Sequence, residues 1–280
     1  MIYPSSTNGR KAFTAGGGGS NIASGSEVAY SLRYVSPLFS GDVILARRGV
    51  DNVTAGFTPT EISDGTLAAW TSEGSGDGNG YVKTWYDQSG NANDATQTTD
   101  SLQPQIVTSG TLETTGGLPS IKWSLTAEHL TLGTTIDHTS GYTTFHVEDF
   151  AGNNGFCLGA LASNIPYTPF RISNGIYIAN GDYYFQDTTA SITSGHALVS
   201  GFCPADGVTT GQDVRLNGTA QTMTAVNYSN STAEFQCLGR RNSAYCDSPG
   251  VQEFIFFAGD NTSEFSNIET EMNDYYSIFV

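Results

Sequence analysis

The stretch FRISNGIYIANGDYYF, from Phe170 to Phe185, decides the fold class. Its apolar residues alternate with other residues, as expected when every second side chain of a β-strand faces a core. Two Asn-Gly pairs, Asn174-Gly175 and Asn180-Gly181, interrupt the alternation. Asn-Gly supplies the two positive-φ positions of a type I′ hairpin turn. The stretch therefore predicts three short antiparallel strands that form a meander.

Similar short runs continue along the chain. We predict further strands at Asp42–Ala46, Tyr81–Tyr86, Ser120–Trp123, Thr143–Val147, Ala197–Phe202, Asp213–Leu216 and Glu253–Phe257. Asn217-Gly218 provides another tight turn. Strands at this spacing, without alternating helices, favour an all-β antiparallel sandwich over a parallel α/β sheet.

One helix is expected near the C-terminus. The apolar residues that recur there at helical spacing are Phe265, Ile268, Met272 and Tyr275. Asn261 can cap the helix start, with Glu264 three residues later. We expect this apolar stripe to pack on the sandwich, and lesser helical content at Glu61–Thr71.

Composition and charge limit the classes of partner that we expect this protein to bind. Of 280 residues 33 are Gly, 38% are hydrophobic, and 11 basic against 27 acidic residues give a net charge of −16. Such a chain can bury a core, and its 11 Lys and Arg residues are few for a protein that binds nucleic-acid phosphates. Apolar runs such as Phe254–Ala258 are far shorter than the roughly 18 residues of a membrane span, and the first residues do not resemble a signal peptide. We therefore expect no nucleic-acid partner, no membrane insertion and no export by a signal of the chain's own.

The four cysteines are Cys157, Cys203, Cys237 and Cys246. They form no Cys-x-x-Cys pair and no zinc-finger spacing with His, so we predict no metal site and no cofactor. Cys237 and Cys246 flank a short polar loop and could form a disulfide. The alternative is free, buried thiols that serve as small apolar side chains.

Residues 1–26 form a low-complexity arm before a single β domain at 27–280. Its centre is Gly16–Gly19, and its only charged side chains are Arg10 and Lys11. A glycine run has nothing of its own to offset the loss of backbone entropy, so we expect a partner to hold the arm, with Arg10 and Lys11 as assembly contacts. The alternative is an ordinary frayed terminus.

Several segments resemble known families. The runs AYSLRYVSPLFSGDVILARRGVDN (Ala29–Asn52) and GDGNGYVKTWYDQSGNANDATQ (Gly76–Gln97) are similar to the opening of the arabinofuranosidase B catalytic domain and of related phage and bacterial proteins. VRLNGTAQ (Val214–Gln221), CLGRRNSAY and VQEFIFFAGDNTSEFSNIETEMNDYY resemble the closing half of laminin-G-like jelly rolls. Both groups belong to the concanavalin A-like lectin/glucanase class. The resemblance implies a two-sheet jelly roll whose concave face often binds glycans.

Hydrolysis would need two carboxyl groups, about 5–5.5 Å apart in a retaining enzyme. Glu148 and Asp149 are adjacent on a predicted strand, so their side chains face opposite sides. The glucanase pattern E-x-D-x-x-E is absent, and so are the adjacent cysteines associated with the arabinofuranosidase site. We therefore predict no catalytic residues and no enzyme activity.

The segment WYDQSGN offers a candidate sugar contact. Of the neighbours Trp85 and Tyr86, one is expected in the core, which leaves the other, with Asp87, free to contact a sugar. The competing hypothesis is that Asp87 ties a turn, or pairs with Arg47 or Arg48.

The same segment resembles the start of a calcium loop, with oxygen-bearing side chains at Asp87, Ser89, Asn91 and Asn93. The twelfth position is Thr98 instead of a bidentate Glu, so a hydrogen-bonded loop is the preferred prediction. The same alternatives apply to EGSGDGNG at Glu73–Gly80.

Together these features lead to a hypothesis of function. We expect a non-enzymatic bacteriophage virion protein whose arm docks on other virion proteins and whose jelly roll lies on the particle surface, as a capsid decoration, head fibre or tail adhesion module. Assembly in the host cytoplasm, release by lysis, homo-oligomerisation and binding of host glycan belong to this hypothesis. The alternatives are an arabinofuranosidase-type glycoside hydrolase and a free bacterial carbohydrate-binding adhesin. Binding residues are not assigned, because a one-residue slip in strand register moves every side chain to the other face.

Overall fold

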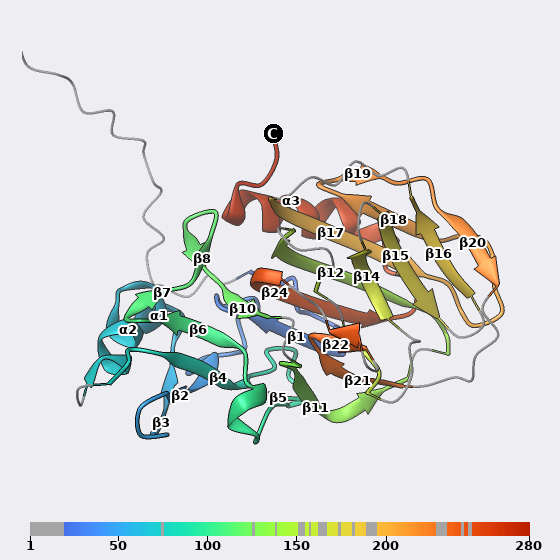
Figure 1. Cartoon of the computed structure of the whole chain (residues 1–280). Coiled ribbons are helices and arrows are strands. Elements are labelled where there is room, and N and C mark those ends of the chain that lie inside the picture. The colour runs from blue at the N-terminus through green and yellow to red at the C-terminus, as the bar shows by residue number, and fades with distance from the viewer. Residues whose placement is uncertain are drawn as a thin grey trace, which may run out of the picture.

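The computed structural model describes residues 20–73, 76–124, 127–137, 139–150, 155–156, 158–161, 167–172, 175–180, 183–188, 195–227, 234–241, 244–245 and 248–280. Across these ranges the strands pair antiparallel and form two packed sheets, A and B, with a helix on the outer side of sheet A (Figure 1). The predicted all-β sandwich is confirmed. No helix in these ranges is both long and apolar enough to cross a membrane.

Sheet A is organised around its longest strand. In spatial order it contains β19 (Thr219–Ala220), β18 (Asp213–Leu216), β17 (His196–Cys203), β12 (Tyr142–Asp149) and β24 (Ser248–Ala258), and then β1 (Val28–Ser31) and β10 (Ile121–Trp123). The last two strands both pair with the edge of β24 that lies opposite β12. β24 therefore connects the first strand of the domain to its centre.

Sheet B contains, in spatial order, β3 (Thr54–Phe57), β2 (Ile44–Arg48), β4 (Gly80–Trp85), β5 (Ala95–Thr96), β11 (Leu130–Ile136), β21 (Phe235–Leu238), β13 (Leu158–Gly159), β14 (Tyr167–Ile172), β15 (Gly175–Asn180), β16 (Tyr183–Asp187) and β20 (Thr224–Asn227). β6 (Gln105–Thr108) pairs with both β4 and β10 and so joins the two sheets. Shorter pieces are β7 (Thr111–Leu112), the 3-10 turn η2 (Asp100–Leu102), the hairpin of β8 (Thr114–Thr115) and β9 (Leu118–Pro119), and the pair β22 (Arg240–Arg241) and β23 (Ala244–Tyr245).

The predicted meander is present as β14, β15 and β16, which pair antiparallel in sequence order. The other predicted strands overlap observed ones, and the prediction for 213–216 matches β18 residue for residue. Asn217 and Gly218 both have positive φ, 51° and 73°, in the turn between β18 and β19. The predicted Asn-Gly hairpin turn is therefore confirmed at this position.

The helices are α1 (Pro59–Ser63), α2 (Thr66–Thr71) and α3 (Phe265–Tyr276), and a 3-10 turn, η3 (Thr262–Glu264), leads into α3. The predicted cap at Asn261 is wrong, because its side chain makes no cap hydrogen bond and donates instead to the carbonyl of Ala258. Asp260 accepts from the backbone N–H of Thr262 and so stabilises the start of η3.

Two cores hold these layers together. The first lies between the sheets and includes Trp85, Trp123 and Phe254. The second lies between sheet A and α3 and contains the predicted stripe residues Phe265, Ile268 and Met272; Tyr275 packs at its margin and Tyr276 is buried in it. Ile22 and Ala23 also pack in this second core, so the described end of the predicted arm lies against the sandwich. Residues 1–19, with Arg10 and Lys11, lie outside the described residues.

Candidate functional site

The inner face of β12 carries a buried polar pair. Phe145 and Val147 face α3 in the second core. Because side chains alternate along a strand, His146 and Glu148 face the interior between the sheets. His146 Nε2 lies 3.0 Å from Glu148 Oε1, and both side chains are fully buried. The backbone N–H of Phe156 donates to Glu148 Oε2 at 2.7 Å, so both carboxylate oxygens are bound within the protein.

Aromatic rings surround this pair. Phe254 stacks against His146 with ring centroids 6.2 Å apart, and Phe156 lies 6.4 Å from the same imidazole. Trp123 meets Phe156 edge-on at 4.9 Å. Two buried atoms of this group, His146 Nδ1 and Trp123 Nε1, have no hydrogen-bond partner among the described residues. Buried polar groups are almost always hydrogen-bonded, so this interior cluster of Trp123, His146, Glu148, Phe156 and Phe254 is the candidate internal site.

Asp149 follows Glu148 but points to the other side of sheet A. It lies opposite His196 of β17 in the strand register. Burial raises the pKa of Asp149, and the nearby His196 opposes that rise. The prediction that the two adjacent carboxylates face opposite sides is confirmed. Within the described ranges, no three His, Cys, Asp or Glu side chains are grouped so that they could hold a metal ion.

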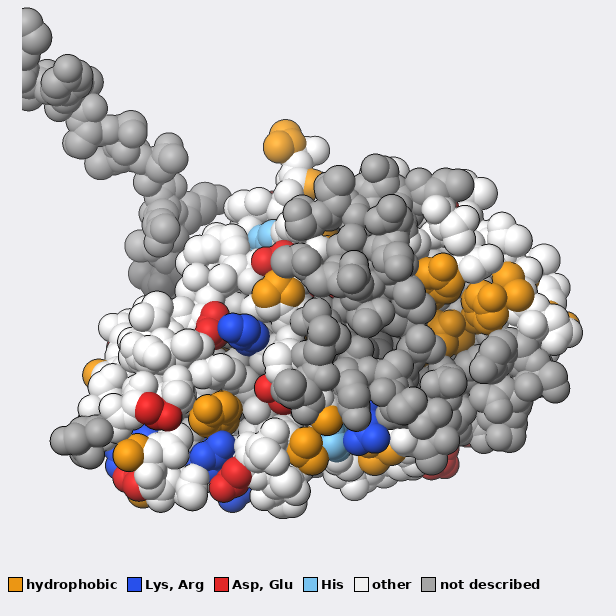
Figure 2. All heavy atoms as spheres, viewed as in Figure 1, with side chains coloured by type: hydrophobic (Ala, Val, Ile, Leu, Met, Phe, Trp, Pro, Cys, Tyr) orange, Lys and Arg blue, Asp and Glu red, His pale blue; other side chains and the backbone are white. Residues whose placement is uncertain are grey.

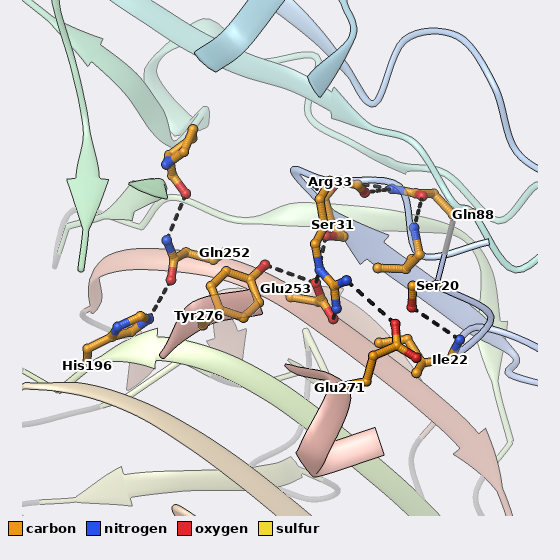
Figure 3. Close-up of polar contacts among 12 residues, drawn as sticks. Ser20, Ile22, Ser31, Arg33, Gln88, His196, Gln252, Glu253, Glu271 and Tyr276 are labelled. Carbon is orange, nitrogen blue, oxygen red and sulfur yellow. Dashed lines mark hydrogen bonds and ion pairs between the residues drawn. The ribbon is translucent and has the colours of Figure 1, made fainter. Parts of the chain in front are cut away.

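A second polar network lies on the outer face of sheet A, beneath α3 (Figure 3). Glu253 of β24 accepts hydrogen bonds from Arg33 Nε and Nη2 at 2.7 and 3.0 Å. The hydroxyl groups of Ser31 and Tyr276 also donate to Glu253, each at 2.9 Å. A buried charge is tolerated when it is paired and hydrogen-bonded, so this network joins β1, β24 and α3 and has a structural role.

Gln252, beside this network, fixes the β8–β9 hairpin (Figure 3). Its Nε2 donates to the carbonyls of Thr115, Leu118 and Pro119 at 3.1, 3.1 and 3.0 Å. Because the amide nitrogen is the donor, Oε1 accepts from His196 Nε2, at 2.6 Å. Burial lowers the pKa of His196, which favours its neutral form.

Asp87 ties a turn, as the competing hypothesis predicts. Its carboxylate accepts from the backbone N–H groups of Ala29 and Asn93 at 2.9 and 3.1 Å. Trp85 is fully buried in the first core, and Tyr86 is half-buried. The expectation that one of the two aromatic residues fills the core is therefore confirmed.

Arg47 and Arg48, which were considered as partners of Asp87, form ion pairs with other residues. Arg47 forms an ion pair with Asp100 at 3.4 Å. Arg48 pairs with Asp51 and with Glu73, both at 2.8 Å. Each arginine also stacks on an aromatic ring, which leaves both with structural roles at the edge of sheet B.

The loop after Asp87 is hydrogen-bonded, as predicted. Ser89 Oγ donates to Asp87 Oδ2 at 2.6 Å. Asn93 Oδ1 accepts from the N–H of Thr134 at 2.7 Å, and its Nδ2 donates to the carbonyl of the same residue at 2.9 Å. In the second glycine-rich segment, Asp77 accepts from the N–H of Asn79 at 2.9 Å, and residues 74–75 lie outside the described residues.

Cys203 and Cys237 are free and buried. Burial raises the pKa of the Cys237 thiol to about 12. The prediction of buried free thiols is confirmed for these two, which excludes the disulfide considered for Cys237 in this structure. Cys157 and Cys246 lie outside the described residues.

No protein-family model matches the chain, and no curated protein matches it. Solved structures of arabinofuranosidases do match this chain. One, complexed with arabinofuranosyl-α-1,2-xylobiose, superposes with a TM-score of 0.54 at 15% identity over 91% of this chain and 63% of that one. A GH54 α-L-arabinofuranosidase mutant soaked with 4-nitrophenyl α-L-arabinofuranoside gives a TM-score of 0.56 with the same identity and coverage. The chain thus spans less than two thirds of the length of these enzymes, and it shares their β-sandwich fold.

Proposed function

We propose that this protein binds carbohydrate through its β-sandwich and does not hydrolyse it. The shared fold supports a carbohydrate ligand, because one solved neighbour is complexed with an arabinofuranosyl oligosaccharide and another was soaked with an aryl arabinofuranoside. The fold hosts many activities, so the argument about hydrolysis depends on particular side chains.

The proposal that no hydrolysis occurs depends on the burial and the hydrogen bonds of Glu148. It is the carboxylate of the interior cluster, yet it is fully buried and both of its oxygens are hydrogen-bonded within the protein. A retaining enzyme needs a second carboxyl group about 5–5.5 Å away, and the neighbouring Asp149 faces the opposite side of the sheet. Glu253, the other fully buried glutamate of this sheet, is bound to Arg33 on the outer face. Among the described residues, the groups bonded to Glu148 are an imidazole and a backbone N–H, which do not complete an acid and nucleophile pair.

The experiment measures hydrolysis and binding on the same preparation. We expect no release of 4-nitrophenol from 4-nitrophenyl α-L-arabinofuranoside, and slower migration in native gels that contain arabinoxylan than in gels without polysaccharide. Turnover that disappears in a Glu148→Gln variant would show that the protein is a glycosidase. Migration unchanged by arabinoxylan, xylan, β-glucan and mannan would remove the binding proposal.

We propose a bacteriophage particle as the setting, with the sandwich displayed on its surface. The sequence supports this setting through the glycine-rich arm, whose two basic residues precede an acidic body with 9 basic and 27 acidic residues. Because Ile22 and Ala23 pack in the second core, the deletion that tests docking is residues 1–19. We expect that deletion to abolish incorporation into particles and to leave the thermal unfolding of the sandwich unchanged. Particles that carry the truncated protein at full occupancy would contradict the setting.

A further inference from the structure

A β-bulge in β4 turns Tyr86 to the outer face of sheet B. Two adjacent residues of β2 lie opposite Val82 and Thr84, which leaves Lys83 as an extra residue in β4. Because of this extra residue, Val82 and Trp85 both face the first core although three positions separate them. Lys83 and Tyr86 therefore face outward, and both are half-buried.

Asp94 lies beside Tyr86. The last residue of β4, Trp85, pairs with the first residue of β5, so Tyr86 and Asp94 are the next neighbours in the register. The N–H of Asp87 donates to Asp94 Oδ1 at 2.9 Å, which holds the carboxylate at this end of the strand pair. Ala95 is buried in the first core, so Asp94 shares the outer face with Tyr86.

Asp42 reaches the same surface from the segment before β2. Gly56 of β3 lies opposite Leu45 on the outer face, and a Cβ built on Gly56 would overlap the Asp42 carboxylate. The absence of a side chain at Gly56 therefore leaves the space that this carboxylate occupies. Burial raises the pKa of Tyr86, and Asp94 and Asp42 add to the rise, which agrees with two carboxylates near the phenol.

The side chains around this ring, which we call the Tyr86 site, are those of Asp42, Lys83, Tyr86 itself and Asp94. Within the described ranges, Asp42, Lys83 and the phenol form no hydrogen bond or ion pair, and the ring has no aromatic or cationic neighbour. Asp94 uses one carboxylate oxygen for the N–H of Asp87, and no described group binds the other. An ammonium group and two carboxylates thus lie around one aromatic ring without pairing with one another.

None of the described helices covers this part of sheet B. Ile62 of α1 and Leu67 of α2 are buried in the first core, so both helices lie on the inner side of the sheet. α3 covers sheet A and lies away from β2 and β4 in Figure 1. In Figure 2 described residues make up most of the surface around β2, β3 and β4, with acidic, basic and hydrophobic side chains interspersed. Asp42 is exposed, and the other three residues of the Tyr86 site are half-buried.

The chemistry of the Tyr86 site selects the ligand. A sugar ring has an apolar face that stacks on an aromatic side chain, and hydroxyl groups that bond to carboxylates and amines. The two carboxylates and the net charge of −16 repel an anionic ligand, and a cationic ligand would lie close to the ammonium group of Lys83. We propose that the Tyr86 site binds one sugar unit of a neutral glycan, which stacks on Tyr86 and donates hydroxyl hydrogen bonds to Asp42 and Asp94. This inference rests on the proposed function and specifies where the glycan binds.

Substitutions at the Tyr86 site test the inference in native gels with and without arabinoxylan. We expect Tyr86→Ala to weaken arabinoxylan binding about tenfold, and Tyr86→Phe to stay within about twofold of wild type, because phenylalanine retains the ring that stacks. Asp42→Asn should weaken binding about threefold, because the amide oxygen accepts hydrogen bonds without the charge of a carboxylate.

Tyr81 supplies the matched control. It lies on the same face of β4 and is half-buried, but the Arg47 guanidinium covers its ring at 4.5 Å from the centroid. We expect Tyr81→Ala to leave arabinoxylan binding within about twofold of wild type. Thermal unfolding verifies that each variant is folded. If Tyr86→Ala is not folded, Asp42→Asn supplies the test, because Asp42 makes no hydrogen bond or ion pair with another described residue.

Each contrary result has a distinct meaning. Full binding by the folded Tyr86→Ala variant, or an equal loss of binding in Tyr81→Ala, would place the glycan elsewhere and leave the proposed function intact. Wild-type protein that binds none of the neutral polysaccharides would remove the proposed function itself. Wild-type binding that is stronger to glycol chitosan, a cationic polysaccharide, than to arabinoxylan, and that Tyr86→Ala abolishes, would overturn the choice of a neutral ligand.

Discussion

Gly116 of the β8–β9 hairpin lies against the ring of His196. A Cβ at Gly116 would come within 2.5 Å of His196 Nδ1 and 2.8 Å of Cε1. The imidazole cannot move aside easily, because Gln252 holds its Nε2 and the Tyr276 ring meets it edge-on at 6.0 Å. The hairpin therefore depends on a residue without a side chain at this position.

Gly117 makes a matched comparison for the first prediction. Both glycines have positive φ, 59° and 81°, but a Cβ at Gly117 would meet no atom of the described residues within 4 Å. We expect Gly117→Ala to cost about 1–2 kcal/mol in the free energy of unfolding, from backbone strain, and Gly116→Ala to cost clearly more. Urea unfolding of both variants measures the difference, and equal losses would contradict the close contact with His196.

Removal of one partner from the Arg33–Glu253 pair should be costly. Glu253→Leu leaves a buried guanidinium without its bidentate acceptor, and breaking such a pair typically costs about 3–5 kcal/mol. We expect the double variant Arg33→Met/Glu253→Leu to lose less than the sum of the two single variants. Chemical denaturation of the four proteins gives the coupling energy, and additive losses would show that the pair contributes no coupling.

His196 should make stability depend on pH. Burial lowers its pKa in the folded protein, so the unfolded chain takes up the proton first as the pH falls. The contribution of His196 to stability is therefore complete when the pH is above the pKa of histidine in the unfolded chain, about 6.5. This contribution is lost as the pH falls from there through the lower pKa of His196 in the folded protein. The difference in unfolding free energy between wild type and His196→Gln should shrink between pH 7.5 and pH 5. A difference that grows over this range would show the opposite sign of shift.

Glu269 on α3 should change the pH dependence of stability in the direction opposite to that of His196. Burial raises its pKa, while Ser200 and Arg215 oppose the rise. A carboxyl group whose pKa is raised in the folded protein stabilises that protein when the pH is below the pKa of the group in the unfolded chain. That stabilisation is lost as the pH rises through the pKa of the group in the folded protein. We expect Glu269→Gln to raise the urea midpoint at pH 8 relative to wild type and to have little effect at pH 4. A lower midpoint at pH 8 would mean that the ion pair with Arg215 outweighs burial.

The thiols give a rapid test of the packing. Burial raises the pKa of Cys237 to about 12 and also raises that of Cys203. We expect neither residue to react with iodoacetamide in the native protein at pH 8, and both to react after unfolding without reductant. Peptide mass spectrometry identifies the labelled positions. A Cys237 that reacts in unfolded protein only after reduction would indicate a disulfide.

The fold followed from local patterns in the sequence. Alternation and Asn-Gly turns located the strands, because both signals act within a few residues. The Asn261 cap failed because a 3-10 turn precedes α3 and moves the hydrogen bonds to Asp260. A propensity for capping does not determine which of two adjacent polar residues begins the turn.

The candidate sites could be predicted only in part. Glu148 and Asp149 were separated correctly by strand alternation, but the pairing of Glu148 with His146 and the approach of Phe156 depend on how distant segments pack. Between Phe145 and Glu148 apolar and polar residues alternate, and this pattern is the sequence signal that places His146 and Glu148 on one face.

The pairing of β1 with β24 brings Val28 opposite Phe256 and so links strands more than two hundred positions apart. During synthesis the ribosome releases the first strand long before its partner exists, and sheet A can close only after the partner emerges. Contacts of such long range slow folding, and they leave apolar strand edges open to other nascent chains in the meantime. Expression at low temperature, or with chaperones that shield such edges, should therefore raise the yield of native protein.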